Sequence, residues 1–168
     1  LDKEVKFLHK ENSYCERETV YWWFNDTASV TILALEKMKK LNEECPEGCK
    51  CVPSTMYYKL NTLEVTAKVD CSSLGLFKFP LKLPSETVEL IVSNNSISSL
   101  STLVVSEYYE NVQRLFIDDN EISSMEELAG TKFFENFTIL SLKNNKIKEI
   151  PNYILSSLEK NLNSGKVR

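Results

Sequence analysis

Three segments of the chain repeat one pattern of side chains at intervals of 25 residues. They begin at Thr87, Val112 and Phe137 and read TVELIVSNNSI, VQRLFIDDNEI and FTILSLKNNKI. Each has aliphatic residues at its fourth and sixth positions, asparagine at the ninth and isoleucine at the eleventh. The residues are Leu90, Val92, Asn95 and Ile97; Leu115, Ile117, Asn120 and Ile122; and Leu140, Leu142, Asn145 and Ile147. Self-similarity at a fixed spacing of this size is typical of repeat architectures, so we expect a stack of similar units.

The chemistry of the repeated positions predicts how each unit folds. Alternating aliphatic residues form a short strand with one buried face, and neighbouring units can stack these strands into a parallel sheet. Asn95, Asn120 and Asn145 follow the strands, where a side-chain amide can pair with backbone groups of its own and the neighbouring unit. Later columns of the repeat should also face inward: Leu100, Met125 and Ile150; Leu103, Leu128 and Tyr153; Tyr108, Phe133 and Leu158. The segment from Met125 to Leu128 can start a helical turn.

Four of the five cysteines lie immediately before the first unit, in the spacing C-x3-C-x-C-x19-C. A repeat cannot bury its own end, so the first unit of a stack needs a cap. The spacing allows three disulfide pairings. Structural zinc is the competing reading, but paired C-x2-C knuckles are missing. We therefore expect a disulfide-bonded cap that contains Cys45, Cys49, Cys51 and Cys71, and neither a metal nor a cofactor.

These two adjoining motifs resemble extracellular leucine-rich-repeat proteins with a cysteine-rich N-terminal flank, the group that includes Toll-type receptors, Slit, the Nogo receptor and decorin. The resemblance covers roughly residues 45–161. It implies an α/β solenoid, a right-handed horseshoe with short parallel strands on its concave face, and the bonds Cys45–Cys51 and Cys49–Cys71. The interval between Cys51 and Cys71 is longer than is usual in this group. The implied division is an N-terminal extension (1–44), a cysteine-rich cap (45–86), three repeats (87–111, 112–136 and 137–161) and the start of a truncated further repeat (162–168).

The extension contains an apolar stretch, Val20–Phe24, and a segment at 28–41 whose apolar spacing fits an amphipathic helix. Trp22 and Trp23 can be buried against the cap or exposed as a binding anchor. This Cys-containing, Tyr-Trp-Trp-Phe-Asn segment resembles the corresponding part of an insect secreted repeat protein. Cys15 is the odd cysteine, which indicates an intermolecular bond, a free thiol or a partner outside the chain. Since no cysteine-rich closing flank follows Leu158, we expect the native protein to continue.

Recognition in such proteins usually takes place on the concave sheet. The strand register assigns nine outward-pointing residues: Glu89, Ile91 and Ser93; Arg114, Phe116 and Asp118; Ile139, Ser141 and Lys143. The three apolar members among these charges are typical of a protein-binding patch. The alternative is a narrow face that neighbouring repeats or a glycan cover. Asn136, Asn94 and Asn25 begin Asn-x-Ser/Thr sequons, which, with the clustered cysteines, favour a secreted glycoprotein or a membrane-protein ectodomain.

Charge and composition argue against several other functions. The net charge of −4 gives no basic face for nucleic acid. One histidine, four glycines and cysteines expected in disulfides give no recognisable catalytic group, so we expect no enzyme. The acidic run from Asp118 to Glu121 lacks the spaced ligands of a calcium loop. The interpretation is a protein-binding module for a ligand or receptor, and the alternative is a structural or matrix protein that self-associates as a homodimer. Membrane attachment would require a segment outside this chain.

Overall fold

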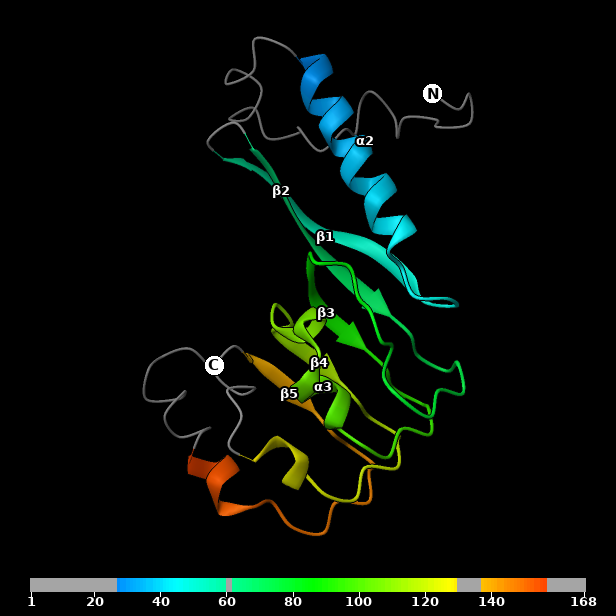
Figure 1. Ribbon diagram of the computed structural model, residues 1–168, viewed down its shortest axis with the longest axis vertical. Coiled ribbons are helices and arrows are strands. Elements are labelled where there is room, and N and C mark those ends of the chain that lie inside the picture. The colour runs from blue at the N-terminus through cyan, green and yellow to red at the C-terminus, as the bar shows by residue number, and fades with distance from the viewer. Residues whose placement is uncertain (1–26, 60–61, 130–136, 157–168) are drawn as a thin grey trace.

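Each of the three repeated segments forms a short strand that contains its first aliphatic residue, Leu90, Leu115 or Leu140, and ends just before the second. These strands are β3 (Thr87–Ile91), β4 (Arg114–Phe116) and β5 (Ile139–Ser141). They complete a five-stranded sheet that begins with β1 (Lys50–Lys59) and β2 (Thr62–Asp70), in the order β1-β2-β3-β4-β5. β1 and β2 are antiparallel, whereas all later neighbours are parallel. The computed structural model describes residues 27–59, 62–129 and 137–156, without the side chains of 27–32, 58–59 and 62 (Figure 1).

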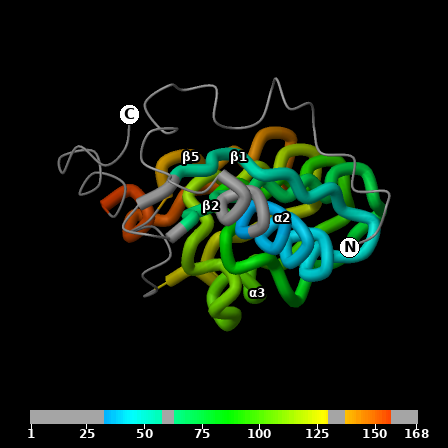
Figure 2. Tube along the Cα trace, turned by 90° about the horizontal axis from the view of Figure 1, so that it is seen from above, coloured from blue at the N-terminus to red at the C-terminus, as the bar shows by residue number. Residues whose placement is uncertain are grey.

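In the described ranges, short helices follow β3 and β4. They are α3 (Ser101–Val105), η1 (Glu107–Tyr109) and η2 (Glu126–Leu128). The helical turn predicted from Met125 is therefore confirmed as η2. Figure 2 shows α3 on one side of the molecule and β1 and β5 on the other. Each unit thus leaves the sheet, turns and returns in the same direction, which a parallel pairing of consecutive strands requires.

The core lies between the sheet and these return segments. Leu90, Val92 and Ile97 are fully buried, and Leu115, Ile117 and Ile122 occupy the equivalent buried positions one unit later. Leu100, Met125, Leu103 and Leu128 are also buried, as their columns predict. Because each side chain lies between a preceding and a following unit, burial comes from stacking and not from the fold of one unit.

Two of the columns expected to face inward differ from the prediction. Ile150 is 52% exposed, because no described segment lies over it on the side away from the preceding unit. Tyr108 is also exposed, while its neighbour Tyr109 is buried. The turn of η1 directs Tyr109 inward, where its hydroxyl donates to the Pro80 carbonyl and its ring meets Phe79 edge-on at 6.0 Å. Phe133 and Leu158 lie outside the described residues.

The long Cys51–Cys71 interval forms an extended hairpin from β1 and β2, with a register shift between Pro53 and Thr55. The helix predicted at 28–41 is present as α2 (Thr27–Glu43), and it lies beside this hairpin at one end of the molecule (Figure 1). Leu41 is buried, and Lys37 and Lys40 both approach the Glu86 carboxylate, at 3.4 and 3.5 Å. The hairpin and α2 therefore form one flank of the stack.

Two disulfide bonds join this flank, Cys45–Cys51 and Cys49–Cys71. They are the pairing that the family resemblance implied among the three that spacing allowed. The bonds connect the loop after α2 to the start of β1 and to the end of β2. Since all four sulfur atoms are in disulfides, they are not thiolates that could hold zinc. The bonds also indicate that the protein matures in an oxidising environment.

Candidate protein-binding surface

The strand register brings the predicted face residues into rows that cross the sheet. Glu89 pairs with Arg114 and Arg114 with Ile139, while Ile91 pairs with Phe116 and Phe116 with Ser141. Leu90 and Leu115 alternate with them and point into the core. We call the surface formed by the nine predicted residues and Lys68 the sheet face.

The first row of the sheet face is charged. Glu89 accepts a hydrogen bond from Arg114 Nε at 2.7 Å, and Lys68 Nζ lies 3.2 Å from its other carboxylate oxygen. Partial burial raises the pKa of Glu89, but the hydrogen bonds and charges of Arg114 and Lys68 lower it more, so the net pKa is lowered. Glu89 is therefore held as a carboxylate between two cations. Lys68 was missed by sequence reasoning because the repeat pattern does not include β2.

The apolar part of the sheet face is divided between two rows. Ile91 and Phe116 are direct neighbours and are half-buried, whereas Ile139 is 43% exposed and continues the charged row beside Arg114. Ile139 and Phe116 are thus diagonal neighbours, within reach of large side chains on adjacent strands. Ile91 and Phe116 thus form a pair of apolar neighbours, and Ile139 lies diagonally from Phe116, beside Arg114.

The third row consists of Ser93, Asp118 and Lys143, just beyond the strands. Asp118 Oδ1 accepts hydrogen bonds from the Ser141 hydroxyl at 2.6 Å and from the Lys143 N–H at 2.8 Å. Ser93 is half-buried and Lys143 is exposed. Asp118 therefore links its unit to the next one.

Asn95, Asn120 and Asn145 occupy the same place in successive turns. Asn120 accepts the Ile97 N–H at 2.9 Å and donates to the carbonyls of Val92, Ile117 and Asp118. Asn145 repeats this set one unit later, accepting from Ile122 and donating to the carbonyls of Ile117, Leu142 and Lys143. Asn95 contacts the cap in the same way: it accepts from Leu74 and Leu76 and donates to the carbonyls of Cys71, Val92 and Ser93. These side chains satisfy turn backbone groups and are not directed at a ligand.

A second polar column precedes these asparagines and was not predicted. Asn94, Asp119 and Asn144 have φ values of 56°, 55° and 54°, and Ser73 in the cap has 59°. Asn94 Nδ2 donates to Ser73 Oγ, and Asn144 Nδ2 donates to Asp119 Oδ1. Asparagine and aspartate tolerate this left-handed conformation better than most residues. The Asn, Asp, Asn sequence at the eighth position of the repeat was the available signal.

Only one of the three sequons lies in the described part of the chain. Asn94 is exposed at the end of the sheet face, where its side chain contacts Ser73. Asn25 and Asn136 fall outside the described residues, as do Cys15 and the pair Trp22–Trp23. Among the described helices, none is both long enough and apolar enough to cross a bilayer.

Comparison with known proteins finds similarity to two curated insect proteins. The chain is 35% identical over 120 residues to Protein halfway of Drosophila melanogaster, which covers 67% of this chain and 20% of that protein. It is 37% identical over 116 residues to Protein halfway of Drosophila pseudoobscura pseudoobscura, covering 65% of this chain and 20% of that protein. The matched region thus spans a fifth of the length of these curated relatives. No family model matches the chain.

Proposed function

We propose that the chain is the capped start of an extracellular leucine-rich-repeat protein of the right-handed horseshoe type, which binds a protein ligand or receptor through its sheet face. The observation that carries the architecture is the register: residues 25 positions apart pair one to one from Glu89 to Arg114 to Ile139. A disulfide-bonded flank at one end of this stack supports it. The proposal includes no catalytic step.

The chemistry of the sheet face supports a protein as the ligand. An exposed isoleucine, a half-buried phenylalanine and a fixed row of charges combine apolar contact with directional polar groups, as in protein interfaces. Arg114 is already oriented by Glu89, so less side-chain freedom is lost when a partner binds. A small metabolite would need a concave site that buries most of its surface. The sheet face is instead an open surface formed by neighbouring rows of side chains.

The disulfide bonds and the exposed Asn94 sequon support secretion. Disulfides persist in oxidising compartments and are rare in the cytosol. A glycan on Asn94 would stand at the end of the sheet face, beside Ser93, and would restrict approach from that side. The proposal therefore places the ligand over the middle of the strands, around Phe116 and Ile139.

Binding of the secreted full chain to a panel of secreted and cell-surface ectodomains tests this proposal. Ile139→Glu should weaken a captured interaction at least about tenfold, because it replaces an exposed apolar side chain of the sheet face with a charge. Leu155→Glu is the matched control, since Leu155 is also 43% exposed but lies outside the sheet face. Equal losses in both variants, or none in Ile139→Glu, would contradict the assigned surface.

Light scattering of the same proteins separates recognition from self-association. We expect the wild-type chain to be a monomer whose mass does not change with concentration. A stable dimer that Ile139→Glu dissociates would assign the sheet face to assembly and overturn its role in ligand recognition.

A further inference from the structure

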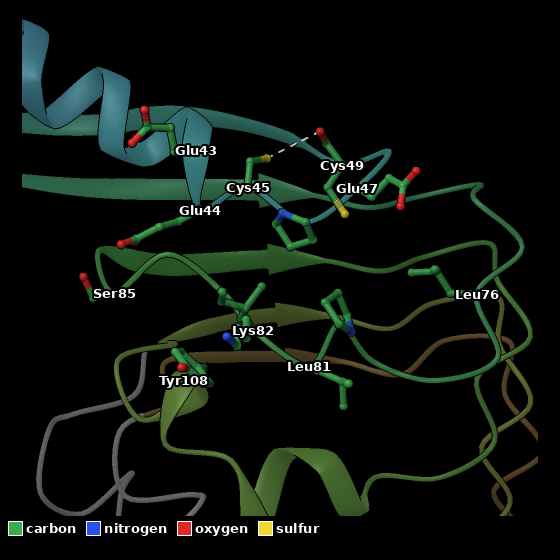
Figure 3. Close-up of a pocket in the computed structure, with 13 residues that line it drawn as sticks. Glu43, Glu44, Cys45, Glu47, Cys49, Leu76, Leu81, Lys82, Ser85 and Tyr108 are labelled. Carbon is green, nitrogen blue, oxygen red and sulfur yellow. Dashed lines mark hydrogen bonds between the residues drawn. The ribbon is translucent and has the colours of Figure 1, made fainter.

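A groove between the disulfide-bonded loop and the segment that precedes β3 lies away from the sheet face. It has a volume of about 780 Å³ and is open to solvent. Glu43, Glu44 and Glu47 are among the residues of one wall, and Leu81, Lys82 and Tyr108 are among those of the other. Figure 3 shows Glu43, Glu44 and Glu47 around the disulfide-bonded loop, with Leu81, Lys82 and Tyr108 below them in this view.

The second wall exposes large apolar side chains. Leu81 is 78% exposed, and Tyr108 is also exposed. Leu83 beneath them is buried in the core and fixes this segment, as does Pro80, whose carbonyl accepts from the Tyr109 hydroxyl. Leu81 is therefore held outward by neighbours that face inward. An apolar side chain presented in this way on a fixed segment is a candidate contact for a partner.

The first wall is acidic. Glu43 and Glu44 contact Lys39 and Lys40 at 3.7 and 3.6 Å, but these are solvent-exposed pairs one helical turn apart. Such exposed pairs contribute little to stability. Glu47 is exposed in the loop between Cys45 and Cys49, which the two disulfides hold in place. The groove lining has three glutamates and one lysine, so its charge favours a basic partner.

We propose that this groove binds an extended protein segment in which a large apolar side chain is flanked by lysine or arginine. The apolar side chain would contact Leu81 and Tyr108, and the basic groups would meet Glu43, Glu44 and Glu47. Charge complementarity selects this occupant, because a basic segment adds counter-charges at Glu47 and at the solvent-exposed Glu43 and Glu44, whereas an acidic segment would be repelled there. The groove is a second surface, separate from the sheet face and independent of its proposed ligand.

Two pools of immobilised peptides test the proposal with the full-length secreted chain as probe. Both pools carry Leu or Phe at the centre, flanked by Lys and Arg in one and by Asp and Glu in the other. We expect about tenfold stronger binding to the basic pool, falling as salt is raised, because two or three exposed ion pairs combine. The double variant E43K/E47K should reverse the preference, and Leu81→Ser should weaken binding to both pools.

Matched variants separate the groove from general surface effects. Phe77→Ser changes a residue that is 75% exposed in the same segment but does not line the groove, and Glu149→Lys changes an exposed charge in the last unit. Both should bind the basic pool like the wild type. Equal binding of the two pools, or a preference that E43K/E47K leaves unchanged, would overturn the proposal.

The chain itself contains a segment of this chemistry, VKFLHK at residues 5–10. A full-length variant with Lys6→Glu, Phe7→Ser and Lys10→Glu tests it as a competing occupant. We expect this variant to bind the basic pool no more tightly than the wild type. Binding that appears only in this variant would show that the chain's own segment fills the groove and that an external partner does not.

Discussion

The units that begin at Val112 and Phe137 carry the same pattern, yet their aliphatic residues differ in burial. Leu115 and Ile122 are fully buried, whereas Leu140 and Ile147 in the equivalent places are only partly covered. The contrast is larger for Met125, which is 3% exposed, and Ile150, which is 52% exposed. β4 lies between two strands, while β5 ends the described sheet. The repeated pattern thus specifies which side chains can be buried, whereas the presence of a neighbouring unit on each side decides how deeply they are buried.

Truncation of equivalent leucines should produce the largest difference between the two units. Leu115→Ala should lower the free energy of unfolding by about 4 kcal/mol, because it leaves a cavity enclosed on all sides. Leu140→Ala should cost about 2 kcal/mol or less, since its site is partly open. Urea denaturation of the disulfide-intact proteins measures both. Equal losses would mean that residues outside the described ranges cover Leu140 as fully as Leu115.

Removing the Cys49–Cys71 disulfide should make amide exchange in the unit that begins at Thr87 more like exchange in the unit that begins at Phe137. Cys49→Ser together with Cys71→Ser should cost about 3 kcal/mol, because a closed loop of this size limits the unfolded chain and the bond fixes the end of β2. Amide exchange around Leu90 should then rise toward the rates around Leu140. Unchanged exchange at Leu90 would show that the flank covers the first unit without this bond.

Asn120 and Asn145, which occupy equivalent turns, should show the same difference between the two units, with a smaller effect on stability. Asn120→Ala should cost about 3 kcal/mol, because it leaves the buried Ile97 N–H and the Val92 carbonyl without that partner. Asn145→Ala should cost about 1 kcal/mol less, since water can reach its more exposed turn. Thermal unfolding of the two variants gives the comparison, with Asn144→Ala as an exposed neighbouring control.

The smallest effect should come from the charged row of the sheet face. The pKa of Glu89 is lowered in the folded chain, so its contribution is present above the ordinary carboxyl pKa of 4.5 and is lost as pH falls through the lower folded value. Wild type should therefore lose less than about 1 kcal/mol relative to Glu89→Gln on acidification below that range. Urea titrations at a series of pH values from 7 downward test this: the wild-type advantage should be greatest above pH 4.5 and should fall on further acidification, and an advantage that grows as the pH falls would contradict the assigned ionisation.

Local sequence information was sufficient where one residue type had one physical role. The spacing of Leu115 and Ile117 predicted a strand, and the apolar spacing over 28–41 predicted the helix that α2 forms. It failed at Tyr108 and Tyr109, because a one-residue difference in a 3₁₀ turn decides which aromatic faces inward. It also missed Lys68, since only the parallel pairing of β2 with β3 places that side chain beside Glu89. The register of the sheet face was predictable, but the ion pairs across it were not.

The sequence by itself determined the 25-residue period, the short strands, the turn asparagines and a cysteine cluster before the first unit. These depend on the local geometry of strands and turns and on residue chemistry that recurs at each turn. Tertiary structure decided the Cys45–Cys51 and Cys49–Cys71 pairing, the Lys68–Glu89–Arg114 row, the exposure of Ile150 and the acidic groove facing Leu81. Each of these depends on which segments become neighbours in space, and a periodic sequence does not specify the neighbours at the ends of its own stack.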